Sequence, residues 1–307
     1  MGKIKGAIII PTFYKKRHER GSRSMVSKVL FDRIQKLCGF SLVYTDKPNL
    51  EELDVAVIYA VPYHNRPKIP SGLFSSDVKL ISFYADLPCY DNRECEANRE
   101  IIFHGCDLVV GGFYEAFTEW YPQYVHKYEL FPGCCYPYER YANLKMNPKP
   151  IMKCLLSGTS NKFYPFRRYI KKLYRRNASG VSKLMDISGR FVIPFKKYPK
   201  FLNKYFCAIA TAGMHGCIVS KYFEIPAAGT LLLAERNEEL DLLGFKPYTH
   251  YIPITMENVI EKIKGVLSHP KDYTQIRKDA MKFVQKNHSD INRVLQFKSI
   301  VEELVDA

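Results

Sequence analysis

The segment Ala212–Gly229, AGMHGCIVSKYFEIPAAG, joins two glycines to a helix-like run that contains one carboxylate. Gly213 and Gly216 follow a strand-like run, where glycines allow a tight turn and close approach of a ligand to the backbone. A helix that begins near 218–220 would offer unpaired N–H groups and the positive end of its dipole to an anion. We therefore expect a diphosphate to bind the backbone at Cys217, Ile218 and Ser220.

Glu224 lies three residues after Lys221 and four after Ser220, so the three side chains share one face of the expected helix. A buried carboxylate is costly unless it is paired, and an anion beside it would repel it. A sugar nucleotide avoids this conflict, because its diphosphate takes the N–H groups while its ribose hydroxyls donate to the carboxylate. The spacing alone favours the alternative, a structural salt bridge between Glu224 and Lys221 or another basic side chain nearby.

A second basic group follows the strand-like run 151–157, in the stretch SGTSNKFYPFRR. The ammonium of Lys162 and the guanidinium of Arg167 could neutralise a nucleoside diphosphate that leaves during a transfer reaction. Gly158 would let the backbone approach the same ligand. The alternative is an exposed basic face that continues along the next helix, and Arg168 fits that alternative better.

Strand-like and helix-like segments alternate along both halves, which is the order of βαβ units around parallel sheets. In the first half we expect strands at 4–10, 41–44, 54–61, 78–84, 108–110 and 128–131, and helices at 24–37, 92–104 and 115–121. In the second half we expect strands at 151–157, 184–187, 206–211 and 230–234, and helices at 166–176, 199–205, around Glu224, at 256–267, at 273–286 and from 292. The pattern predicts an α/β protein with two doubly wound domains in tandem.

The segment Pro137–Pro150, PYERYANLKMNPKP, holds three prolines and shows no period, so we expect an interdomain linker there. The expected domains are 1–140 and 151–291, with the C-terminal helix, about 292–307, packed back on the first. Ligands of such sheets bind at the carboxyl ends of the strands, which face the cleft in the expected arrangement.

The formal net charge of +15 would attract polyanions: nucleic acid, anionic lipid or phosphorylated small molecules. The 47% of hydrophobic residues indicates a globular protein, and no apolar run reaches the roughly 18 residues of a membrane-spanning helix. The nine cysteines show no C-x-x-C spacing, which argues against a zinc site or a disulfide framework. We expect a soluble cytoplasmic protein with reduced thiols.

The run KYFEIPAAGTLLLAE, residues 221–235, resembles the donor-binding segment of retaining GT-B glycosyltransferases of the group 1 (glycosyltransferase family 4-like) type. The resemblance continues through LGFKPYTHYIPIT, ENVIEKIKGVLSHP and KNHSDINRV, and covers roughly 151–295. It extends to members of similar size encoded by large algal viruses. It implies the GT-B fold, with two Rossmann-like domains facing each other across a cleft. It also implies that Glu224 holds the donor ribose and that Gly158, Lys162 and Arg167 bind the donor diphosphate.

The sequence departs from the family pattern at Gly216, where the larger family carries another glutamate that faces the donor sugar. We expect this contact to come instead from Gly213, His215, Gly216 and Lys221. His215 is then one candidate catalytic residue. Asp86 is the other, because it follows a predicted strand and could orient an acceptor hydroxyl; the alternative is an aspartate that caps a turn.

The resemblance implies a hexosyltransferase that moves a sugar from a nucleoside-diphosphate donor to a hydroxyl acceptor with retention of anomeric configuration. We expect GDP-mannose as the donor first and a UDP-sugar next, no metal or other cofactor, and a glycan, glycoprotein or glycolipid as acceptor. Peripheral contact with an anionic membrane and a homodimer are further expectations. Two alternatives stay open: a nucleic-acid-binding or DNA-modifying protein, and a sugar-nucleotide epimerase on the same fold.

Overall fold

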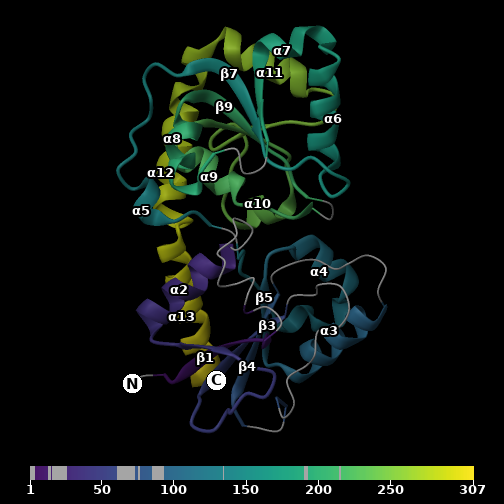
Figure 1. Cartoon of the computed structure of the whole chain (residues 1–307), viewed down its shortest axis with the longest axis vertical. Coiled ribbons are helices and arrows are strands. Elements are labelled where there is room, and N and C mark those ends of the chain that lie inside the picture. The colour runs from purple at the N-terminus through teal and green to yellow at the C-terminus, as the bar shows by residue number, and fades with distance from the viewer. Residues whose placement is uncertain are drawn as a thin grey trace. The chain divides into compact units, whose positions relative to one another are not determined.

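The structure is a computed structural model, and it describes residues 4–12, 15, 26–60, 73–74, 77–84, 93–133, 135–189, 193–213 and 216–307. The chain divides into two compact units (Figure 1). Unit 1 comprises Met1–Gly133 together with Asp290–Ala307, and unit 2 comprises Cys134–Ser289. Each unit is built on its own sheet, and every strand pair in both sheets is parallel.

The sheet of unit 1 has six strands in the order β2-β1-β3-β4-β5-β6. These strands are β1 (Gly6–Ile10), β2 (Ser41–Tyr44), β3 (Val55–Ala60), β4 (Lys79–Tyr84), β5 (Leu108–Gly111) and β6 (Tyr128–Leu130). The helices of unit 1 are α2 (Val26–Cys38), α3 (Arg93–Gly105), α4 (Tyr114–Trp120) and α13 (Asp290–Asp306), with a 3₁₀ helix η2 (Pro122–Lys127).

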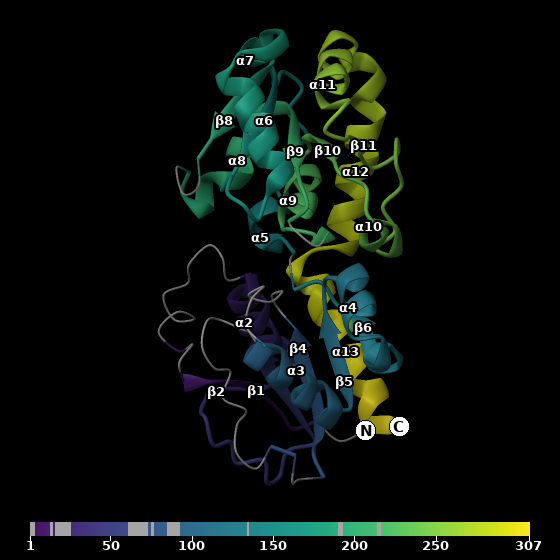
Figure 2. The same ribbon diagram turned by 90° about the vertical axis from the view of Figure 1, so that its right-hand side faces the viewer.

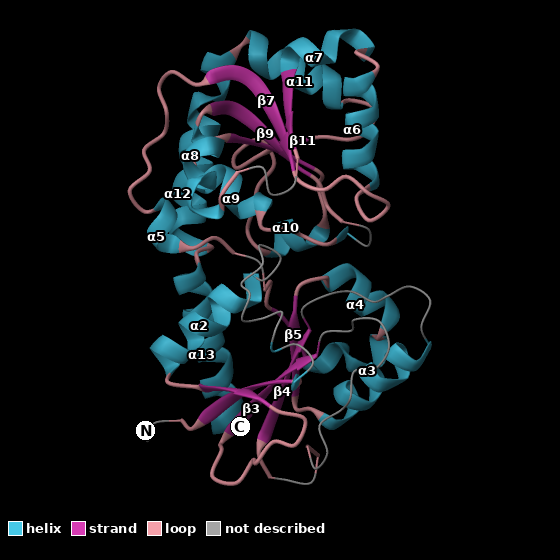
Figure 3. Cartoon of the chain, viewed as in Figure 1, coloured by secondary structure: helices cyan, strands magenta, loops and turns pink. Residues whose placement is uncertain are grey.

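Helices cover both faces of this sheet, with α2 and α13 on one side and α3 and α4 on the other (Figure 3). The packing of β1 on both faces explains why its sequence is apolar throughout. Ile8 and Ile10 enter the core under α2 and α13, whereas Ala7 and Ile9 enter the core under α3 and α4. A strand buried on both faces needs apolar residues at every position rather than at every second one.

The C-terminal helix α13 packs against α2 in unit 1. The rings of Phe40 and Phe297 meet edge to face, with their centroids 5.5 Å apart. At the start of the helix the buried carboxylate of Asp290 accepts hydrogen bonds from Nε and Nη2 of Arg33, at 3.3 and 3.1 Å. The last residues of the chain therefore complete the apolar core formed by the first ones.

The sheet of unit 2 has the order β11-β10-β9-β7-β8. Its strands are β7 (Ile151–Ser157), β8 (Met185–Ser188), β9 (Tyr205–Ala210), β10 (Leu231–Ala234) and β11 (Ile252–Pro253). The helices are α5 (Tyr138–Tyr141), α6 (Pro165–Arg175), α7 (Val181–Leu184), α8 (Tyr198–Asn203), α9 (Lys221–Ala227), α10 (Glu238–Leu242), α11 (Val259–Ser268) and α12 (Thr274–Asn287). In Figure 2, β8, α6 and α7 lie on one side of this unit, and α11 and α12 lie on the other.

The expected alternation of strands and helices is present in both units, and three local differences stand out. The short strand β11 was not anticipated, because two residues are too few to show a period. The segment Pro137–Pro150 is part of unit 2 rather than a linker between units. Its helix α5 buries Tyr141, and the side chain of Asn147 donates to the Asn203 carbonyl at 3.2 Å. Helix α9 begins at Lys221 rather than near 218–220.

No helix in the described part of the chain combines the length and the apolar character needed to cross a membrane.

Candidate functional site

The carboxyl end of β7 brings two cations against one glycine. Gly158 has φ +106°, and its N–H donates to the carbonyl of Ser188 at 3.1 Å. A Cβ atom at this position would lie 2.9 Å from Nζ of Lys221 and 3.2 Å from Nη1 of Arg167. Three residues singled out in the sequence therefore meet in space, and we call Gly158, Arg167 and Lys221 the anion cradle.

Arg167, in the first turn of α6, is the buried cation of the cradle, with only 3% of its surface exposed. Its Nη1 donates to the carbonyl of Thr159 at 2.7 Å, and the guanidinium lies over the Tyr164 ring at 4.1 Å. Its Nε and Nη2 have no hydrogen-bond partner in the described part of the structure. Burial lowers the pKa of Arg167, since desolvation disfavours the charged form. Buried donors of this kind normally have an acceptor, so the two nitrogens mark a place for a bound anion.

Lys221 supplies the second charge of the cradle, from the first position of α9. The sequence assigned this role to Lys162, but Lys162 is exposed and its ammonium lies 5.4 Å from the centre of the Phe163 ring. Lys221 had instead been expected to contact a donor sugar. In the structure Lys221, rather than Lys162, therefore lies beside Gly158 and Arg167, and which lysine contacts a diphosphate stays a prediction.

Two hydrogen bonds involve the glycine-containing loop before α9. The N–H of Gly213 donates to the Cys217 carbonyl at 3.1 Å, and the Gly216 carbonyl accepts from Nδ2 of Asn237 at 2.7 Å. Gly216 has φ +71°, which explains a glycine at that position. Cys217, Ile218 and Ser220 precede the helix, and Ile218 is buried. His215 and Asp86, the two predicted catalytic residues, lie outside the described residues.

Glu224, on α9, is buried, with 7% of its surface exposed. Burial raises the pKa of Tyr141, and the charge of Glu224 raises it further, which places the carboxylate near that phenol. Tyr198 contributes to the same effect, and its hydroxyl lies 2.8 Å from Oγ of Ser157. The site therefore holds a buried carboxylate among hydroxyl groups, next to the strand that leads into the cradle.

Glu235 is a second carboxylate at this edge, and the sequence analysis missed it. It follows the last residue of β10 and accepts a hydrogen bond from the N–H of Ala212 at 2.8 Å. Burial raises its pKa to about 7, although that N–H and the charge of Arg167 act in the opposite direction. Burial raises the pKa of Tyr222, and the charge of Glu235 raises it further. The sequence feature that could have revealed Glu235 is a carboxylate immediately after an apolar strand, at the edge of the sheet where ligands bind.

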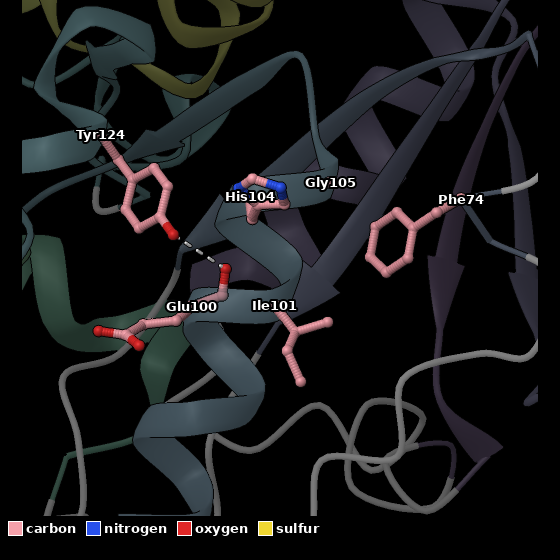
Figure 4. Close-up of a pocket in the computed structure, with 6 residues that line it drawn as sticks. All are labelled: Phe74, Glu100, Ile101, His104, Gly105 and Tyr124. Atoms are coloured by element: carbon pink, nitrogen blue, oxygen red, sulfur yellow. Dashed lines mark hydrogen bonds between the residues drawn. The ribbon is translucent and has the colours of Figure 1, made fainter.

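Unit 1 contains a separate pocket of about 500 Å³ (Figure 4). It is lined by Phe74, Glu100, Ile101, His104, Gly105 and Tyr124. The Tyr124 hydroxyl donates to the Glu100 carbonyl at 3.4 Å. Phe74 precedes β4 and Gly105 precedes β5, so the pocket lies at the amino ends of these strands. It is therefore at the opposite edge from the one where doubly wound sheets bind ligands.

Comparison with known proteins adds independent findings. Residues 170–299 match the family model described as glycosyl transferase-like. An Anabaena protein, HepE, solved with UDP and glucose, superposes with a TM-score of 0.65 at 10% identity, covering 98% of this chain and 100% of that one. The chain has the GT-B fold. Residues 170–299 are thus similar to glycosyl transferase-like proteins, and the chain as a whole shares the fold of the GT-B structures.

Two further GT-B structures cover almost the whole chain. A glycosyltransferase from Rickettsia africae has a TM-score of 0.61 at 11% identity, with 99% of each chain covered. An alpha-glucosyltransferase in complex with UDP and a 13-mer DNA has a TM-score of 0.62 at 10% identity, with 100% of each chain covered. No curated protein matches the chain.

Proposed function

We propose that this protein transfers a hexose from a nucleoside-diphosphate sugar to a hydroxyl acceptor. The observation that carries the proposal is the anion cradle, in which a buried guanidinium with two open donor nitrogens lies beside an ammonium and the half-buried turn at Gly158. A diphosphate supplies the acceptor oxygens that these donors lack, and planar guanidinium donors suit it well. Two of the structural neighbours hold UDP, so UDP-sugars are the first donors to test, beside the GDP-mannose favoured by the resemblance.

The proposed mechanism uses charges that belong to the chain. Arg167 and Lys221 would neutralise the nucleoside diphosphate as it leaves, and stabilisation at the place where charge develops is the largest catalytic contribution of this kind of site. Glu224 would accept hydrogen bonds from the ribose hydroxyls. We propose metal-independent transfer with retention of configuration, in keeping with the resemblance. The acceptor is a glycan or glycolipid hydroxyl in this proposal, and a hydroxyl on a DNA base is the alternative, as the DNA-bound neighbour suggests.

Glu224→Ala should weaken donor binding at least about tenfold, because a hydrogen bond to a charged group contributes about 1.5–3 kcal/mol. Isothermal titration calorimetry with UDP-glucose, GDP-mannose and ADP-glucose would measure this. Glu261→Ala, an exposed carboxylate on α11, is the control and should change nothing. Absence of binding by all three sugar nucleotides at millimolar concentration would refute donor binding itself.

Donor affinity should fall up to about tenfold between pH 6 and pH 8, because Glu235 has a pKa of about 7 and is ionised above it. An ionised Glu235 beside Arg167 would repel the incoming diphosphate, whereas the protonated form would not. UDP-glucose is the suitable ligand, since its diphosphate is esterified at both ends and has no terminal phosphate to titrate near neutral pH. The Glu235→Gln variant should show the same affinity at both pH values; a wild-type affinity independent of pH would contradict the role of Glu235.

A further inference from the structure

The excess of basic over acidic residues lies entirely in unit 2. Unit 2 contains 27 of the 46 Lys and Arg residues but only 11 of the 31 Asp and Glu residues, whereas unit 1 contains 19 basic and 20 acidic residues. Within unit 2 the stretch 140–204 holds 17 basic residues and one acidic residue, Asp186. Asp186 is already paired with Lys153 at 2.8 Å. The excess of basic residues in unit 2 is much larger than the two cations of the anion cradle.

Much of this charge lies at the amino ends of β7 and β8, the edge of the sheet opposite the cradle. Helix α6 starts after the carboxyl end of β7 and returns to the amino edge, where α7 follows it (Figure 1). The carbonyl of Lys204, after α8, accepts from the N–H of Ile151 at 2.7 Å, which places both residues at this edge. Six exposed cations come from these segments: Lys149, Lys172, Arg175, Arg176, Lys183 and Lys204.

We call these six residues the basic rim. None of them has a carboxylate partner among the residues that the structure describes. The first two residues of β7, Ile151 and Met152, are 45% and 43% exposed between Lys149 and Lys153. A strand that is buried over its last four residues thus begins with two apolar side chains in water, between the unpaired Lys149 and Lys153, which is paired with Asp186.

We propose that the basic rim, with Ile151 and Met152, is a docking surface for an anionic membrane. Cations at such a surface are attracted to acidic lipid headgroups, and exposed apolar side chains gain by entering the interfacial region. A nucleic acid would neutralise the cations but would leave Ile151 and Met152 in water, and the rim offers no exposed aromatic ring on which a base could stack. Charge and apolar exposure together therefore favour a lipid surface.

This docking mode leaves the carboxyl edge of the unit 2 sheet, with the cradle, free of the membrane. The inference does not depend on the proposed donor chemistry, because it rests on residues at the other edge of the sheet. It predicts that a bound protein still titrates with a sugar nucleotide.

The test is co-sedimentation of the full chain with phosphatidylcholine vesicles that contain or lack about 30% phosphatidylserine. We expect binding only to the acidic vesicles at 0.1 M salt, and its loss at 0.5 M salt, because the Debye length shortens from about 10 Å to a few ångströms. The triple variant Lys149→Glu, Lys183→Glu, Lys204→Glu should bind at least about tenfold more weakly. Ile151→Ser with Met152→Ser should weaken binding severalfold while leaving the salt dependence unchanged.

A matched control carries the same change of charge elsewhere on unit 2: Lys246→Glu, Lys278→Glu, Lys282→Glu, all exposed. This variant should retain most of the binding. Circular dichroism of every variant verifies that it is folded. Equal loss of binding in both triple variants would overturn the assignment to the rim. Binding of a 30-base-pair DNA that is lost on rim reversal, without binding to acidic vesicles, would overturn it in favour of a nucleic acid.

Discussion

Replacing Arg167 with methionine should lower the affinity for the sugar-nucleotide donor at least about 100-fold while leaving the fold no less stable than the wild type. The guanidinium is buried, and two of its nitrogens have no partner in the described structure, so the cost of desolvating the charge offsets its hydrogen bond to Thr159 and its contact with the Tyr164 ring. Apolar replacement of a buried charge is often neutral or stabilising. A bound diphosphate, in contrast, would lose a charge-assisted contact, and a loss of 100-fold corresponds to about 2.7 kcal/mol.

Calorimetric titration and thermal unfolding of the same samples separate the two effects. Arg168→Met is the matched control, since Arg168 is the next residue and is exposed. It should change neither affinity nor stability. If Arg167→Met unfolded the protein while Arg167→Lys bound the donor as well as the wild type, Arg167 would be a structural residue and the cradle would not bind the diphosphate.

Replacing Gly158 with alanine should weaken donor binding about 30-fold and lower the free energy of unfolding by about 1–2 kcal/mol. The stability cost comes from φ +106°, which an L side chain adopts only with strain. The loss of affinity has another cause. The new Cβ would approach Nζ of Lys221 to 2.9 Å, and the flexible end of that side chain would move away from the site.

A double-mutant cycle distinguishes these causes. Gly158→Ala should add little to the loss of affinity already caused by Lys221→Ala, because the ammonium that it displaces is then absent. Gly180→Ala is the control, since Gly180 has φ +72° but nothing within 4 Å of an added Cβ. It should lower stability without changing affinity. Additive effects of the Gly158 and Lys221 substitutions on affinity would show that the two residues do not act on one ligand.

The sequence by itself determined the α/β class and the position of most elements. Buried parallel strands such as β1 and β9 need apolar residues at every position, and this local requirement is visible without any tertiary information. It also singled out Gly158, Arg167, Lys221 and Glu224 as candidates, because glycines and charges beside an expected strand end are unusual enough to be noticed. The local sequence pattern did not show which of these residues lie next to one another in the folded protein.

Tertiary structure decided which cation completes the cradle. Lys162 is nearer to Arg167 in the sequence, but α9 follows the carboxyl end of β9, so its first residue, Lys221, lies beside Gly158 instead. The tertiary structure also places Glu235 beside Ala212. The hydrogen bond from the Ala212 N–H to Glu235 forms because β9 and β10 are neighbours in the sheet. The basic rim has the same origin. Its cations are spread over 56 residues of sequence, from Lys149 to Lys204, and they gather only because β7, α6, α7 and α8 all present an end at one edge.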